Sequence, residues 1–247
     1  MIALQATALR RQYGGLRALD DLHLDVLRHE IHAIVGLNGA GKTTFMRAAT
    51  GMTRLDAGEL RVLGDAVSNA TPSVWAQVGH MIEYPFAYPE LTVCENIVAS
   101  GRLHWLDTVN ARARADLWID RLALGQWAHR PARALSLGNR QRLGIACALV
   151  HAPRLVILDE PTSALDPSGV LLLRDAVVES AASGAGVLVS SHHLDEVSRI
   201  AHRISVVHGG RVIGTLKPGT PDIERAFFAM LHAWDASNGN TSHERVS

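Results

Sequence analysis

Short apolar runs alternate along this chain with longer segments of helical periodicity. Four of the runs predict buried strands, at 31–36, 154–160, 186–191 and 203–214. The last run contains Gly209-Gly210, which predicts a hairpin turn between two strands. Strands that alternate with helical segments are typical of an α/β fold with a mainly parallel sheet.

The first thirty residues have a different pattern. Leu22, Leu24 and Val26 alternate with polar residues, as on a strand with one buried face. This alternation predicts a small antiparallel β subdomain at the N-terminus.

Between about 92 and 150 the pattern is mainly helical. Thr92 followed by Glu95 is a capping box and predicts the start of a helix. A later helix carries Leu143, Ala146, Cys147 and Val150 on one face, and Pro153 ends it. We therefore expect a helical subdomain at about 84–152, inserted into the α/β core.

The C-terminal part predicts two more helices and a tail. Asp166-Pro167 supplies an N-cap and an N1 proline, so a helix is expected to begin there. The segment 222–234 predicts a short helix, and the polar tail 236–247 is expected to be disordered. Residues 1–235 are thus expected to form a single domain.

Composition narrows the classes of function. The 24 basic and 24 acidic residues balance, which argues against a nucleic-acid partner. The two cysteines, Cys94 and Cys147, form no disulfide framework and fit a reducing compartment. No apolar run reaches the length of about 18 residues that indicates a membrane span, so a membrane role would need a partner protein.

The segment "GLNGAGKTT" (36–44) follows a predicted strand and fits the phosphate-binding loop pattern G-x-x-x-x-G-K-[ST]. Its glycines let backbone N–H groups converge on phosphate oxygens, and the helix that follows directs its positive end at the same anion. Lys42 is expected to reach the β- and γ-phosphates, and Thr43 to offer a hydroxyl to Mg²⁺. The residues expected to bind nucleotide in this loop are Asn38, Gly39, Gly41, Lys42, Thr43 and Thr44.

The segment "LVILDEP" (155–161) is an apolar strand that ends in two acids. Asp159 would lie at the carboxyl edge of the sheet, where such folds bind ligands, and suits Mg²⁺. Glu160 points in another direction and suits the activation of a water molecule. A pair of solvated strand-end acids is the plainer interpretation, and the phosphate-binding loop weakens it.

The segment "LSLGNRQRLGIACALV" (135–150) resembles the signature motif of ABC-type ATPases, commonly L-S-G-G-Q. Leu137 and Asn139 replace the usual Gly and Gln, whereas Ser136 and Gly138 are kept. The resemblance implies that Ser136 and Gly138 bind the γ-phosphate of ATP held by a second subunit.

Further motifs of this family occur in order, and the resemblance covers about residues 2–231. Tyr13 matches the aromatic residue that stacks on adenine, although a loop tyrosine is more often a packing residue. "SALD" (163–166) resembles the D-loop, with Asp166 reaching across the dimer. "SSHHLDEV" (190–197) resembles the switch segment, with His192 as the residue that senses the γ-phosphate and His193 as a surface residue.

The resemblance implies a mechanism. Two such domains, from identical or from different chains, would form a head-to-tail ATPase dimer that ATP and Mg²⁺ close and hydrolysis opens. Glu160 would polarise the attacking water, while Lys42 and His192 stabilise charge on the γ-phosphoryl group. The cycle would drive an integral membrane permease from the cytoplasmic face of the membrane.

Two other classes of ATP- or GTP-dependent protein fit these motifs less well than a transporter subunit does. A GTPase or nucleotide kinase would leave 135–150 unexplained. A soluble ABC-type ATPase acting on ribosomes or DNA usually carries two such domains or long coiled coils, and this chain has neither.

The segment "VGHMIEYPFAYPELTVCENI" (78–97) narrows the subfamily. With 135–150, it resembles bacterial exporters of the bacitracin-resistance and lantibiotic-immunity type, which implies export of a drug or a peptide antibiotic. A lipid or another non-peptide substrate is the alternative. Glu83 stands where the family usually has glutamine. We expect it to serve the metal and catalysis and to couple Mg-ATP to a permease-facing loop.

Overall fold

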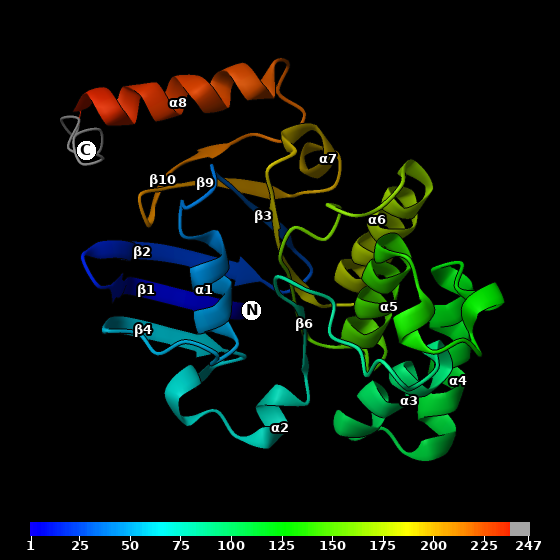
Figure 1. Ribbon diagram of the computed structural model, residues 1–247. Helices are drawn as coiled ribbons and strands as arrows, with labels where there is room; N and C mark the ends of the chain where they lie inside the picture. The colour runs from blue at the N-terminus through cyan, green and yellow to red at the C-terminus, as the bar shows by residue number, and fades with distance from the viewer. Residues whose placement is uncertain (238–247) are drawn as a thin grey trace.

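Two β-sheets of opposite character form the frame of the molecule, and a group of helices extends from one side (Figure 1). The computed structural model describes residues 1–237. The strands are β1 (Ile2–Tyr13), β2 (Leu16–Leu27), β3 (Ile31–Val35), β4 (Ala57–Val62), β5 (Asp65–Ala66), β6 (Val78–Met81), β7 (Leu155–Leu158), β8 (Gly186–Ser191), β9 (Arg203–His208) and β10 (Arg211–Leu216). The α-helices are α1 (Lys42–Ala49), α2 (Pro72–Trp75), α3 (Val93–Leu103), α4 (Thr108–Arg121), α5 (Leu137–Leu149), α6 (Pro167–Ala182), α7 (Leu194–Ser198) and α8 (Ile223–Ser237).

The N-terminal sheet has the order β2-β1-β4-β5 and all its pairs are antiparallel. The second sheet has the order β10-β9-β3-β8-β7-β6 and is parallel except for the β9–β10 hairpin. These sheets confirm the expected α/β fold with an N-terminal antiparallel part and a mainly parallel core. The strands β4 and β5 were not predicted.

The central strands are apolar on both faces because each face covers a different core. On β7, Val156 and Leu158 join the core shared with the helices, whereas Leu155 and Ile157 join the core under the N-terminal sheet. All four side chains are fully buried. This double burial explains why the sequence shows continuous apolar runs here instead of alternation.

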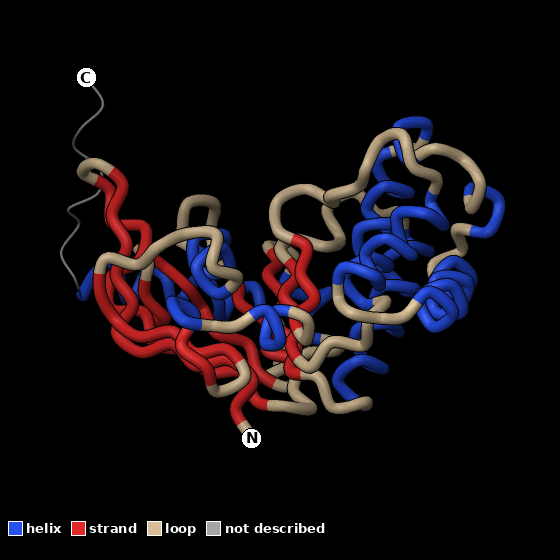
Figure 2. Tube along the Cα trace, turned by 90° about the horizontal axis from the view of Figure 1, so that it is seen from below, coloured by secondary structure: helices blue, strands red, loops and turns tan. Residues whose placement is uncertain are grey.

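Along the chain, the helices α3, α4 and α5 come between β6 and β7. In space they belong to a helical lobe that stands apart from the strands (Figure 2). The predicted capping box is confirmed: the Thr92 hydroxyl accepts from the Glu95 N–H at 3.2 Å, and the Glu95 carboxylate accepts from the Thr92 N–H at 2.8 Å. Leu143 and Ala146 on α5 and the C-cap residue Val150 are buried, whereas Cys147 is only partly buried.

The C-terminal helix α8 packs on β10 and α7. It continues to Ser237, so Ala236 and Ser237, which were assigned to the tail, are helical. The rest of that predicted tail, 238–247, lies outside the described residues. Across residues 1–237, none of the helices has the length and apolar character needed to cross a bilayer.

Candidate active site

The loop between β3 and α1 has a backbone that depends on glycine. Gly39 and Gly41 have φ angles of 81° and 107°, which side chains other than hydrogen strongly disfavour. A Cβ on Gly41 would also lie 2.4 Å from the Ala18 carbonyl oxygen. These two glycines therefore fix the path of the loop into the first turn of α1.

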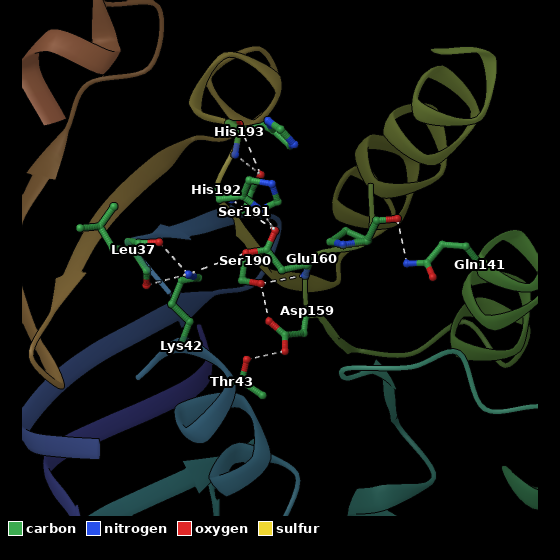
Figure 3. Close-up of polar contacts among 12 residues, drawn as sticks. Leu37, Lys42, Thr43, Gln141, Asp159, Glu160, Ser190, Ser191, His192 and His193 are labelled. Atoms are coloured by element: carbon green, nitrogen blue, oxygen red, sulfur yellow. Dashed lines mark hydrogen bonds and ion pairs between the residues drawn. The ribbon is translucent and has the colours of Figure 1, made fainter. Parts of the chain in front are cut away.

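The Lys42 side chain bends back over this loop (Figure 3). Its Nζ donates to the Gly36 carbonyl at 2.7 Å and to the Leu37 carbonyl at 3.4 Å. The Nζ atom is 3.7 Å from Glu160 Oε1, and the residue is only 6% exposed. A buried ammonium group at the positive end of α1 provides strong attraction for an anion.

Thr43 and Asp159 meet although they are far apart in sequence. The Thr43 hydroxyl donates to Asp159 Oδ2 at 2.8 Å, and Asp159 is 5% exposed. The other oxygen of Asp159 accepts from the Ser190 hydroxyl at 2.5 Å. A hydroxyl and a carboxylate together form the hard-oxygen donor set that suits Mg²⁺.

Ser190 also holds the backbone of Glu160. Its hydroxyl oxygen accepts from the Glu160 N–H at 2.8 Å while its proton goes to Asp159. The sequence analysis did not predict a role for Ser190. The one feature that could have indicated it is a hydroxyl side chain at the carboxyl end of a buried strand, the edge where ligands bind. The strand β7 ends at Leu158, and Glu160 has a left-handed φ angle of 46°, so the two acids face different groups.

The Glu160 carboxylate lies between Lys42 and His192. Its Oε2 atom is 2.6 Å from His192 Nδ1 and also accepts from the His192 N–H at 3.3 Å. His193 instead hydrogen-bonds to Ser191, its N–H donating to the hydroxyl at 2.9 Å. The geometry thus separates the two neighbouring histidines, and it is His192 that contacts the catalytic candidate.

The predicted signature residues lie on the helical lobe. Ser136 is the N-cap of α5, and its hydroxyl accepts from the Asn139 N–H at 3.3 Å. A Cβ on Gly138 would lie 2.9 Å from the Ala164 carbonyl oxygen. Within residues 1–237, neither Ser136 nor Gly138 makes a hydrogen bond to the phosphate-binding loop.

Asp166 is engaged within its own chain. Its carboxylate caps α6 by accepting from the Gly169 N–H at 2.9 Å, and it accepts from Arg142 Nη2 at 2.5 Å and the Ser168 hydroxyl at 2.8 Å. The bond from Ser168, followed by those from Gly169 and Arg142, holds the pKa of Asp166 below its ordinary value. Arg142 was not predicted, and through this contact it joins α5 to the start of α6.

Tyr13 lies at the end of β1 and is 44% exposed. The Arg11 guanidinium lies 4.5 Å from the centre of its ring, a cation–π contact. Hydrogen bonding to Thr53, then to Arg11, lowers the pKa of the Tyr13 hydroxyl. The Arg11 guanidinium thus occupies one face of the Tyr13 ring, so a nucleotide base would stack on the other face.

Glu83 follows β6 and has a left-handed φ angle of 63°. Its Oε1 atom is 3.4 Å from Arg47 Nη1, and both side chains are a little under half exposed. Arg47 stands four residues after Thr43 on α1, so this ion pair ties the segment after β6 to the helix of the phosphate-binding loop.

A groove of about 360 Å³ opens beside Glu83. Tyr84, Phe86 and Tyr88 line it, and the first two are 80% and 72% exposed. Pro85 packs so closely on α5 that a Cβ on Gly144 would lie 2.5 Å from its Cβ. The segment after Glu83 is thus seated on the helical lobe and presents aromatic rings outward.

Comparison with known proteins agrees with this geometry. The ABC transporter family model matches residues 19–163. The chain is 38% identical to the daunorubicin resistance ATP-binding protein DrrA3 of Streptomyces coeruleorubidus, over 89% of this chain and 69% of that protein. It is 31% identical to the bacitracin transport ATP-binding protein BcrA of Bacillus licheniformis, over 85% of this chain and 68% of that protein.

The solved structure of an ATP-binding subunit of an ABC transporter superposes with a TM-score of 0.82 at 28% identity. That match covers 95% of this chain and 98% of the solved one. The chain spans about two thirds of the length of the two curated relatives. The family model spans both the phosphate-binding loop and the two strand-end acids. The chain therefore belongs to the ABC transporter family, as an ATP-binding subunit.

Proposed function

We propose that this chain hydrolyses ATP and thereby drives export of a drug or a peptide antibiotic through a separate membrane permease. The observation that carries the hydrolytic part is the contact of Glu160 with both Lys42 and His192. A carboxylate placed between a phosphate-binding ammonium and an imidazole is suited to orient a water molecule against the γ-phosphate.

The proposed roles follow the geometry of the loop. Backbone N–H groups around Asn38, Gly39 and Gly41 and the first residues of α1, including Thr44, would surround the phosphates. Lys42 would neutralise charge on the β- and γ-phosphates. Thr43 and Asp159 would hold Mg²⁺, with Glu83 near the same edge of the sheet. When bound, the ion would supply charge stabilisation at the phosphates.

The water-activating step belongs to Glu160. Its carboxylate would accept a proton from the attacking water, while the imidazole of His192 would donate to the γ-phosphoryl oxygens. The Ser190 hydroxyl would help to keep the two acids in separate roles, because it donates to the Asp159 carboxylate and accepts from the Glu160 backbone N–H.

We propose a head-to-tail dimer as the catalytic form. Ser136 and Gly138 lie on the helical lobe, where, among residues 1–237, they make no hydrogen bond to their own phosphate-binding loop. They would complete the site of a second subunit. In a pair of identical chains, this arrangement is isologous and forms two equivalent sites. Tyr13 would stack on adenine. Asp166, at the N-cap of α6, would reach across the dimer to the second subunit.

The groove beside Glu83 is the proposed contact with the permease. Exposed aromatic side chains gathered in one groove are typical of protein contact surfaces. We further propose that residues 84–152 act as a helical subdomain within one domain of residues 1–235, since the groove lies between this segment and the core. The chain would then work at the cytoplasmic face of the membrane.

The two curated relatives support the substrate class. One is named for daunorubicin resistance and the other for bacitracin transport, and identity is higher to the first. A drug is therefore supported at least as well as a peptide.

The deciding experiment expresses the chain with the permease encoded beside it in a drug-sensitive host. We expect resistance to a drug or a peptide antibiotic that is lost with Glu160→Gln. Co-purification with ribosomes and no membrane partner would contradict the transporter role.

A further inference from the structure

Tyr13 lies where β1 extends beyond its neighbour β4. The pairing of these two strands ends at Arg10 and Ala57, whereas β1 stays paired with β2 as far as Tyr13. The Tyr13 side chain is nearly half exposed at this end of the sheet. A side chain in such a place loses rotamer freedom when a base stacks on it, and that loss weakens binding. Contacts that order the ring beforehand would therefore favour stacking.

Asp56 directly precedes β4 and extends its contact with β1. The Asp56 N–H donates to the Arg10 carbonyl at 2.9 Å. The Asp56 Oδ2 atom accepts from the Gln12 N–H at 2.7 Å, and the Oδ1 atom accepts from Arg11 Nη1 at 2.8 Å. One carboxylate thus holds both the backbone next to Tyr13 and the side chain that lies on its ring.

The Arg11 guanidinium joins Asp56 to the aromatic ring. Its central carbon lies 4.5 Å from the centre of the Tyr13 ring, and the Arg11 side chain is only 25% exposed. A guanidinium that is hydrogen-bonded to a carboxylate has a fixed orientation, so its contact with the ring is also fixed. Arg11 covers one face of Tyr13 in this way and leaves the other face for a base.

Thr53 holds the hydroxyl end of the same ring through a hydrogen bond. Its own N–H donates to the Arg47 carbonyl at 3.2 Å, in the last turn of α1. Thr53 and Asp56 both belong to the connection between α1 and β4. Because α1 begins at the phosphate-binding loop, this connection fixes the ring relative to the place where phosphates would bind.

We propose that Asp56 is a positioning residue for adenine: through Arg11 it holds the Tyr13 ring in the orientation in which a base stacks on it. The inference rests on the proposed function, in which Tyr13 stacks on adenine. Asp56 itself would not touch the nucleotide. Its effect is preorganisation, because a ring that is ordered before binding loses less freedom on stacking. The phosphates would bind at the opposite end of α1, where Lys42 begins the helix, so Asp56 should affect recognition of the base alone.

The test compares two ligands on the whole chain by calorimetry with Mg²⁺: ATP, and inorganic tripolyphosphate, which has the phosphates but no base. Asp56→Ala should bind ATP about fivefold more weakly, the loss expected when one side chain must be ordered on binding, and should bind tripolyphosphate like the parent. Arg11→Gln should give the same pattern by a second route. The matched control is Glu59→Ala, which removes the carboxylate of another exposed ion pair on β4, with Arg61, and should bind both ligands like the parent.

A double-mutant cycle shows whether Asp56 acts through the ring. Tyr13→Ala should bind ATP about tenfold more weakly, as expected for a lost base–aromatic stack, and adding Asp56→Ala should cause no further loss. A further loss in the double variant, or equal losses for ATP and tripolyphosphate in Asp56→Ala, would overturn the positioning role.

Two other outcomes separate this inference from the proposed function. Parental ATP affinity in Asp56→Ala, together with weakened ATP binding in Tyr13→Ala, would reject the role of Asp56 and keep the stacking role of Tyr13. Parental ATP affinity in Tyr13→Ala would reject the stacking role, and the inference with it.

Discussion

His192 Nδ1 lies 2.6 Å from Glu160 Oε2, across a sequence separation of 32 residues. The contact joins the end of β7 to the segment after β8, two strands that are neighbours in the parallel sheet. It places the Glu160 carboxylate, the proposed proton acceptor, and the His192 imidazole, the proposed donor, side by side near the Lys42 ammonium.

Glu160→Gln tests the proposed base. The amide keeps the size of the side chain but cannot accept a proton from water, so turnover should fall by about a hundredfold or more. ATP binding should persist, because Lys42 and the loop are unchanged. Phosphate release and nucleotide affinity measured on the same preparation check this. A variant that hydrolyses ATP at the parental rate would show that another group is the base.

His192 and His193 form a matched pair for substitution. His192→Ala removes the ring that contacts Glu160 and should reduce turnover strongly. His193→Ala removes a ring that lies against the His192 ring but does not contact Glu160. The hydrogen bonds of His193 to Ser191 involve its backbone N–H and carbonyl, which the substitution keeps, so this variant should retain most of the activity. Equal loss in both variants would argue that the segment, and not the His192 imidazole, matters.

Lys42→Ala tests the phosphate-binding loop. The substitution removes a buried ammonium that lies against two loop carbonyls, and tight binding of Mg-ATP should be abolished in calorimetry. The fold should persist, since most of the apolar core is untouched, and circular dichroism provides the control. Retained tight binding would contradict the role given to this side chain.

Glu83→Gln tests coupling. Both side chains of the Glu83–Arg47 pair are nearly half exposed, so loss of the pair should change stability by less than about 1 kcal/mol. ATP affinity should stay near the parental value, while turnover stimulated by the permease and resistance in cells should change. Glu90→Gln, on the same segment and ion-paired to Arg133, is the control. Unchanged resistance with Glu83→Gln would end the coupling hypothesis.

Two buried histidines predict loss of stability in mild acid. Burial is the main cause that lowers the pKa of His32 to about 4 and that of His151 to about 3. Below the ordinary value of about 6.5, the unfolded chain takes up protons that the folded chain refuses. Stability should therefore fall between about pH 6.5 and pH 5, by up to about 1.4 kcal/mol per pH unit for each group.

Urea unfolding across that pH interval measures the slope. His151→Phe removes one titrating group at a ring that stacks on His104 with 3.8 Å between centroids and makes no hydrogen bond with any described residue. The slope should decrease in this variant by about the share of one histidine. An unchanged slope would show that folding does not lower the pKa of His151.

The parts of the site that could be predicted are those whose residues belong to one short, continuous sequence motif. Asp159 directly follows a buried strand, and Lys42 and Thr43 follow another one after the phosphate-binding loop. The sequence therefore predicts all three at one sheet edge, and the structure brings Thr43 to Asp159. Ser190, Arg142 and Arg47 were missed, because each acts through a partner more than twenty residues away. Such pairings depend on tertiary packing, and a single sequence carries no local signal for them. The short strands β4 and β5 escaped for a similar reason, since β4 is held mainly by its pairing with β1.

The close packing of Pro85 on Gly144 has a consequence for communication between subunits. Gly144 lies eight residues along α5 from Ser136, about 12 Å on a straight helix. A displacement of the segment after Glu83 would therefore move α5, and with it the N-terminus of that helix. In the proposed pair, that end faces the nucleotide of the neighbouring subunit. A signal received by one chain would thus be delivered to the ATP held by the other, so each subunit would report on its own permease contact through its neighbour's hydrolysis.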